Sequence, residues 1–240
     1  MNEFFSDEVG SSIEWFGTTH VFIILGFVFI LFLTAFLGKK LRYRRKLEVV
    51  VRIFLIFLVF IFEWNVFENR LLNTSIIRLP LCAVALYGLT YSVALKKEKA
   101  FKIFYFYWFG TLLTFLFFDT PFGLDRWGGW TYFGAHTMIG ILAIYGITVF
   151  KFIPTKKDLW LSMNVLAVYA ILSGYATFTY GGTDELFLKN PPVEFLNVLK
   201  DTSQILYTAV FSLIAALIMI IMYLPFMTKK ENKEANLNKK

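Results

Sequence analysis

Long apolar stretches alternate along the chain with short loops that are rich in charge. A helix of about 20 apolar residues is what the hydrocarbon core of a bilayer requires, and lipid offers no partners for free backbone groups, so each stretch must be helical. The pattern predicts an all-α membrane protein, a seven-transmembrane helix bundle. The predicted spans lie at about 19–38, 48–67, 76–95, 101–119, 130–150, 158–180 and 204–226.

The composition excludes an ordinary soluble domain. Of the 240 residues, 58% are hydrophobic and 20% are aromatic, which is more apolar surface than a soluble chain of this length can bury. Residues 1–18 contain no Lys or Arg; we therefore expect an extracellular segment there and a first span that is retained rather than cleaved as a signal peptide. The Lys- and Asn-rich tail at 228–240 is expected to be disordered.

Basic residues are distributed unevenly among the loops. Six Lys and Arg residues follow the first apolar stretch, four follow the third, three follow the fifth and five lie in the tail, whereas the other loops hold five in all. Since basic residues of short loops stay on the cytoplasmic side, we expect the N-terminus outside, the C-terminus in the cytoplasm, and a multi-pass protein of the cell membrane. The net charge of +7 then faces anionic lipids. No nucleic-acid-binding module is recognisable, so nucleic acid is not an expected partner.

Polar residues inside the spans gather toward the outer side. An ionisable side chain within a span is costly and indicates a functional site by default. With a rise of about 1.5 Å per residue, both histidines, the single cysteine and the deepest acid fall in the outer third of the bilayer. These residues are His20, Glu63, Cys82 and His136. Arg78 precedes Cys82 by one turn, and Asp119 closes the fourth span.

One chemistry that this set of residues allows is nucleophilic catalysis. A cysteine thiolate attacks an acyl carbonyl well when a nearby histidine takes its proton, and Cys82 and His136 are the only cysteine and the only deep histidine. Glu63 or Asp119 would orient the imidazole. The alternative is that Cys82 is a small apolar packing residue, as most free cysteines are.

Three further interpretations remain open. His20, Glu63, Cys82 and His136 have the residue types of a zinc site, but no two have a characteristic ligand spacing, and we expect neither a metal nor a cofactor. A polar pocket for a ligand or a transported ion would use the same ionisable groups. A network of hydrogen bonds between helices would also account for them.

Three glycines recur at six-residue intervals in the fifth span. They are Gly134, Gly140 and Gly146. Glycine lets helices approach closely, although this interval is not the GxxxG spacing. The glycines therefore allow neighbouring helices to approach the fifth span closely.

Several short motifs, in this order, resemble a known family. They are Trp15-Phe-Gly-Thr-Thr-His20, Glu63, Arg78-Leu-Pro-Leu-Cys82, Phe118-Asp-Thr-Pro121, His136 and Tyr223-Leu-Pro-Phe226. Together they resemble the bacterial YwaF-type integral membrane proteins, which have seven spans and are similar to a eukaryotic transmembrane protein implicated in acyl transfer onto ether phospholipids. In the third span the bacterial pattern reads Leu-Pro-Leu-His-Leu-Cys, whereas here Leu81 is followed directly by Cys82. Either the cysteine replaces the histidine of the pattern, or two residues are absent.

The resemblance implies lipid-directed acyl transfer with Cys82 as the nucleophile and His136 as the general base. Arg78 or Arg126 would hold a lipid phosphate, and His20 and Asp119 are further candidates for contact with the substrate. Membrane lipids are then the expected surroundings and substrates, and no oligomeric state is predicted. The competing interpretation is a non-enzymatic protein that binds a ligand or transports a small molecule or ion.

Overall fold

The computed structural model describes residues 3–6, 10–72, 79–118, 120–180, 184 and 186–237. Within these residues the secondary structure is helical, and no strand occurs. In chain order the elements are η1 (Glu3–Phe5), α1 (Thr18–Leu41), α2 (Arg45–Leu72), α3 (Leu81–Ala94), α4 (Glu98–Phe104), η3 (Tyr105–Trp108), α5 (Phe109–Leu116), α6 (Trp127–Tyr145), η4 (Gly146–Phe150), α7 (Lys156–Tyr180), η5 (Glu194–Leu196), α8 (Asn197–Thr202) and α9 (Gln204–Leu237).

The helices coincide with the predicted apolar stretches. Among the residues that the structure describes, four helices are long and apolar enough to cross a bilayer as single helices. These are α1, α6 together with the π-helical turn η4, α7, and α9 as far as residue 227. The predicted third span is shorter, since α3 has 14 residues and begins only after Pro80. The predicted fourth span is α4, η3 and α5 in succession. The backbone of α9 is helical to Leu237, past the predicted end of the span at 226.

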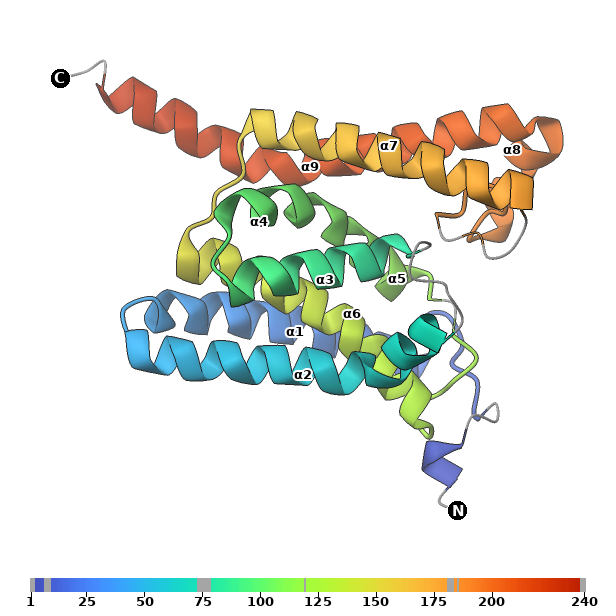
Figure 1. The fold of residues 1–240 in the computed structure, drawn as a ribbon, viewed down its shortest axis with the longest axis horizontal. Helices are drawn as coiled ribbons and strands as arrows, with labels where there is room; N and C mark the ends of the chain where they lie inside the picture. The colour runs from blue at the N-terminus through green and yellow to red at the C-terminus, as the bar shows by residue number, and fades with distance from the viewer. Residues whose placement is uncertain are drawn as a thin grey trace.

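The helices form three layers (Figure 1). The helices α7 and α9 lie together on one side, α1 and α2 lie on the other, and α3 to α6 fill the space between them. Successive long segments run in alternating directions along the longest axis of the molecule. The loops therefore gather at two opposite ends.

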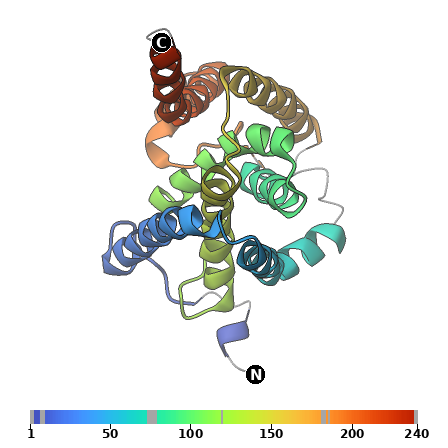
Figure 2. The ribbon, with the colours of Figure 1, turned by 90° about the vertical axis from the view of Figure 1, so that its left-hand side faces the viewer.

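The helix α6 is the centre of the bundle (Figure 2). The three spaced glycines of α6 and η4 face three different helices. A Cβ atom on Gly134 would lie 2.7 Å from the Phe62 ring of α2, and one on Gly140 would lie 2.8 Å from Leu31 of α1. A Cβ atom on Gly146, at the start of η4, would overlap the ring of Phe101 in α4. The neighbouring helices thus make the close approach that these glycines allow.

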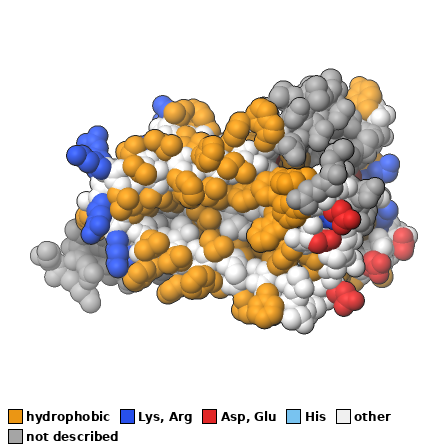
Figure 3. All heavy atoms as spheres, turned by 90° about the horizontal axis from the view of Figure 1, so that it is seen from below, with side chains coloured by type: hydrophobic (Ala, Val, Ile, Leu, Met, Phe, Trp, Pro, Cys, Tyr) orange, Lys and Arg blue, Asp and Glu red, His pale blue; other side chains and the backbone are white. Residues whose placement is uncertain are grey.

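The main core lies where α3, α4, η3 and α6 meet. Leu89, Phe106 and Leu142 there are fully buried. The outer faces of the bundle are instead apolar and exposed, as with Phe32 of α1 at 67% exposure and Ile53 of α2 at 61%. Contiguous apolar surface of this extent is typical of a protein that faces lipid. Figure 3 shows the apolar side chains between one end that carries Lys and Arg, where α1 meets α2, and an opposite end that carries Asp and Glu together with some Lys and Arg.

Candidate functional site

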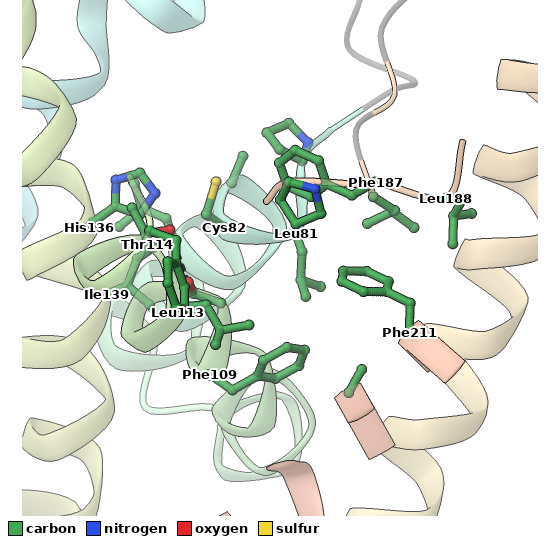
Figure 4. A pocket seen from close by; sticks show the side chains of 18 of the residues that line it. Leu81, Cys82, Phe109, Leu113, Thr114, His136, Ile139, Phe187, Leu188 and Phe211 are labelled. Atoms are coloured by element: carbon green, nitrogen blue, oxygen red, sulfur yellow. Dashed lines mark hydrogen bonds between the residues drawn. The ribbon is translucent and has the colours of Figure 1, made fainter. Parts of the chain in front are cut away.

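A cavity of about 1440 Å³ separates the middle layer from the α7–α9 layer. Side chains from α3, α5 and α6 form one wall, and side chains from α7, α9 and the segment before α8 form the other (Figure 4). Most of the lining is apolar, as Phe109, Leu113 and Phe211 illustrate. Small-molecule sites typically measure about 300–1,000 Å³, so this cavity is large enough for a lipid-sized ligand.

Cys82 enters the cavity from the first turn of α3. Pro80 is the residue that precedes the helix, in an extended conformation, and a proline is tolerated there because the first helical N–H groups have no partner within the helix. The hydroxyl of Tyr169 in α7 accepts a hydrogen bond from the Leu79 N–H at 3.0 Å and donates one to the Leu79 carbonyl. Cys82 is half-buried and lines the cavity, so the altered motif of the third span still presents its thiol there.

His136 enters the same cavity from α6 and is 8% exposed. Its Nδ1 lies 2.7 Å from the Tyr132 carbonyl oxygen. A carbonyl oxygen only accepts, so Nδ1 carries the proton, and in the neutral ring Nε2 keeps its lone pair. Among the residues that the structure describes, none donates a hydrogen bond to Nε2. This is the tautomer that a general base requires.

Glu63 of α2 is the one carboxylate among the described residues that line this cavity. Its Oε2 accepts a hydrogen bond of 2.7 Å from the Tyr87 hydroxyl of α3. A carboxyl group inside a bundle is stabilised only when polar groups surround it, and Tyr87 supplies one of them. The structure thus brings Glu63, Cys82 and His136, three of the four residues expected at one depth, to a single cavity.

His20, the fourth, lies elsewhere and is fully buried. Its Nδ1 accepts the Phe16 N–H at 2.7 Å, and its Nε2 lies 2.8 Å from the Phe115 carbonyl oxygen, to which it donates. His20 therefore fastens the start of α1 to the end of α5, and it is not among the described residues that line the cavity. Its proposed contact with a substrate stays a prediction.

The remaining candidates are basic or acidic residues near the loops. Arg126 precedes α6, with Nη1 4.0 Å from a carboxylate oxygen of Glu3, and it also lies outside the described lining of the cavity. Arg78 and Asp119 lie outside the described residues. Across the described ranges, no three His, Cys, Asp or Glu side chains gather as metal ligands would.

Tyr87, Tyr132 and Tyr169 support the site and were not among the residues singled out from the sequence. Tyr87 reaches Glu63, Tyr132 packs beside the His136 ring at 4.7 Å, and Tyr169 fastens the residue before Pro80. A tyrosine within an apolar span still needs a partner for its hydroxyl. This requirement could have marked the three tyrosines from the sequence, but it does not show which group each hydroxyl contacts.

An all-helical fold with an apolar outer surface and an internal apolar cavity defines a helical membrane protein. The chain belongs to the TMEM164 family, whose family model matches residues 15–223. No curated protein and no solved structure matches the chain.

Proposed function

We propose that this protein transfers acyl groups between membrane lipids, with Cys82 as the nucleophile and His136 as the general base. The observation that carries the proposal is that both side chains line one large apolar cavity. Cys82 is the only cysteine of the chain, and His136, which lines the same cavity, has a lone pair on Nε2. The resemblance to YwaF-type proteins supports the same pair and adds ether phospholipids as the expected acceptors.

The first half of the reaction loads the acyl group onto the enzyme. Nε2 of His136 takes the proton of the Cys82 thiol, and the thiolate attacks the ester carbonyl of a donor lipid. The C–O bond to the lysolipid breaks, and the leaving alkoxide takes the proton back from His136. A thioester on Cys82 and a free lysolipid result.

The second half reverses the proton movements. Nε2 of His136 takes a proton from the hydroxyl of an acceptor lysolipid, and that oxygen attacks the thioester carbonyl. The C–S bond breaks, and the thiolate recovers its proton from His136. Glu63, fixed by Tyr87, contributes negative charge beside the cavity and favours the imidazolium that forms in both halves.

We further propose that the protein crosses the cell membrane seven times, with its N-terminus outside and its C-terminus in the cytoplasm. The alternating helix directions and the gathering of Lys and Arg at one end of the molecule support this arrangement (Figures 1 and 3). The C-terminal end of α3 lies at the basic end of the molecule, and its N-terminal end, with Cys82, points toward the opposite end. In this topology the Cys82 cavity belongs to the outer leaflet.

A labelled donor lipid tests the enzymatic proposal directly. The purified protein, in nanodiscs that contain a phospholipid with an alkyne-tagged acyl chain, is expected to form an adduct that neutral hydroxylamine releases. Any thioester in the chain must lie on Cys82, since it is the only cysteine. Cys82→Ala is expected to abolish the adduct, and His136→Gln to slow its formation by roughly 10²-fold or more.

A matched control moves the thiol by one position. Ala83 also lines the cavity and is 4% exposed, so the double variant Cys82→Ala, Ala83→Cys keeps a thiol in the cavity on another side of α3. We expect no adduct from it. The proposal fails if the wild-type protein forms no adduct and Cys82→Ala leaves the lipid profile of the host unchanged.

The size and apolar lining of the cavity also favour a second function, in which a ligand is bound or transported without reaction. That function predicts that Glu63→Ala and His136→Ala abolish retention of the ligand, whereas Cys82→Ala has no effect. Native mass spectrometry of lipids retained by the three variants separates it from acyl transfer.

A further inference from the structure

A second, smaller cavity lies at the basic end of the molecule, where α1 meets α2 and α3 meets α4. Its volume is about 290 Å³. The residues that line it are Arg42, Arg45, Glu48, Lys96, Val149 and Phe150. Cys82 lies in the first turn of α3 and Lys96 just beyond its end, so by a rise of about 1.5 Å per residue these two residues are roughly 20 Å apart, and the two cavities share no described lining residue. The second cavity is thus separate from the proposed acyl-transfer site.

The three basic residues reach this cavity from two different turns. Arg42 lies in the turn after α1, and Arg45 is the first residue of α2. Lys96 follows α3 with a φ of 52°, and the N–H of Lys97 bonds to the Ser92 carbonyl at 2.8 Å. Glycine normally occupies this left-handed position after a helix. The turn that closes α3 instead presents a lysine at the cavity.

Glu48 does not cancel this positive charge. It is 4% exposed, and its Oε1 lies 2.9 Å from Nε of Arg52, while its Oε2 lies 3.0 Å from Nζ of Lys96. The Tyr145 hydroxyl also donates to Oε1 at 3.3 Å. Both carboxylate oxygens are therefore engaged, and Glu48 serves to hold Lys96 in place.

Arg42 and Arg45 form no ion pair within the described part of the chain, and both are exposed. Arg42, Arg45 and Lys96 thus place three positive charges around the cavity. The one carboxylate among its described lining residues, Glu48, is already paired with Arg52. A guanidinium group matches the geometry of phosphate oxygens with two parallel hydrogen bonds, and an ammonium group adds a point charge. This set of donors is typical of a site for a phosphate group.

The rest of the surroundings favours a phosphate that is attached to a lipid. Val149 and Phe150, from the π-helical turn η4, form an apolar wall, with Nζ of Lys96 5.0 Å from the centre of the Phe150 ring. Within the first two turns of α2, Leu47 and Val50 are 46% and 63% exposed. The cavity thus lies next to the apolar surface that faces lipid.

We propose that Arg42, Arg45 and Lys96 bind the phosphate group of an anionic ligand at the basic end of the molecule, an anionic phospholipid of the adjacent leaflet being the occupant that the apolar surroundings favour. In the seven-span topology proposed above, this leaflet is the cytoplasmic one. The site does not depend on Cys82.

Native mass spectrometry of the full chain from nanodiscs tests this proposal. In nanodiscs of phosphatidylcholine with added phosphatidylglycerol, the wild-type protein is expected to retain phosphatidylglycerol selectively. The double variant Arg42→Gln, Arg45→Gln is expected to bind it roughly tenfold more weakly or worse. The matched control is Lys39→Gln, Arg44→Gln, which removes the same charge from exposed positions in the last turn of α1 and in the turn after it, neither of them among the described lining residues. It is expected to retain the lipid.

A second measurement separates the two sources of phosphate. In nanodiscs of phosphatidylcholine alone, inorganic phosphate is added and the thermal unfolding temperature is followed. A rise that the Arg42→Gln, Arg45→Gln variant loses supports the site with a soluble phosphate as its occupant; no rise, together with selective retention of phosphatidylglycerol, supports a lipid. Equal loss of the lipid in the two double variants, or no selectivity in the wild type, overturns the proposal. Cys82→Ala is expected to behave as the wild type.

Discussion

Tyr87 and Glu63 show at the scale of single residues how the bundle holds a carboxyl group beside an apolar cavity. The two side chains come from adjacent helices, α3 and α2, and share a hydrogen bond of 2.7 Å. A hydroxyl within an apolar helix and a carboxyl group in the next one both lose water when the helices associate. Their pairing therefore offsets part of the cost of burying each.

Tyr87→Phe keeps the ring and removes only this donor. We expect the free energy of unfolding to fall by about 1 kcal/mol, the usual net value of one hydrogen bond, and acylation of Cys82 to become slower. Thermal unfolding in one detergent and the yield of the thioester measure the two effects. Tyr91→Phe, one turn further along α3 and 49% exposed, is the control and should change neither; equal effects in both variants would contradict the assigned role.

Asp125 makes a second residue-scale contact, outside the helices. Its carboxylate accepts the Ser11 hydroxyl at 2.6 Å and the Ser11 N–H at 3.0 Å. These hydrogen bonds hold the pKa of Asp125 below its usual value, because they favour the charged form. They connect the N-terminal segment to the loop that precedes α6.

A lowered pKa in the folded protein fixes the direction of the pH dependence. The contact contributes fully above the ordinary aspartate pKa of about 3.9 and is lost as the pH falls through the lower value of the folded state. In a Cys82→Ala background, spin labels at residues 12 and 124 should therefore report a fixed distance at pH 7 and a broadened one once the pH falls below the folded-state pKa of Asp125. Asp125→Asn should give the broadened distribution at both; a pH response that persists in this variant would refute the role of Asp125.

At the scale of elements, glycine decides how closely α3 approaches α4. A Cβ atom on Gly88 would overlap the ring of Phe104. We expect Gly88→Ala to lower the free energy of unfolding by about 1–3 kcal/mol, the usual cost of overpacking, although alanine improves helix propensity by about 1 kcal/mol. Gly26 of α1 has open space around it, so Gly26→Ala should be neutral or stabilising. Thermal unfolding of both variants in one detergent provides the comparison, and similar melting temperatures would show that α3 can shift away from Phe104.

The positions of the helices could be predicted from the sequence because a bilayer span needs one long apolar run. Local irregularities could not. The four consecutive aromatic residues Tyr105–Trp108 form a 3₁₀ turn with three rings buried, and Gly146–Phe150 forms a π-helix. Both depend on which neighbour each ring meets, and the apolar pattern carries no information on that.

The candidate site could be predicted in part, because the apolar runs also show where each residue lies along its span. Position along a span sets depth, so Glu63, Cys82 and His136 could be assigned to one layer. Depth does not fix the direction in which a side chain points around its helix. His20, at the same predicted depth, is used between α1 and α5 instead, and Tyr87 could not be paired with Glu63 before α2 and α3 were known to be neighbours.

At the scale of the whole molecule, the two ends differ in charge and in the site that we propose at each. The phosphate site that we propose lies at the basic end, and the start of α3, with Cys82, lies toward the other. The helix α3 connects the two sites. Its direction across the membrane therefore decides which leaflet each proposed site faces. If Lys and Arg of the short loops remain on the cytoplasmic side, the turn between α1 and α2 is inside and the segment at α8 is outside.

Labelling of single cysteines in intact cells tests this orientation. In a Cys82→Ala background, Tyr43→Cys places a thiol in the turn after α1, where the native side chain is 79% exposed, and Val198→Cys places one on α8, where it is 70% exposed. A membrane-impermeant maleimide should label Val198→Cys in intact cells and Tyr43→Cys only after permeabilisation, because an odd number of crossings separates the two positions in the seven-span arrangement. Both sites have nearly equal exposure, so a difference in labelling reports the side of the membrane and not local access. The opposite pattern would invert the protein and place the Cys82 cavity in the inner leaflet; labelling of both thiols in intact cells would refute the seven-span arrangement itself.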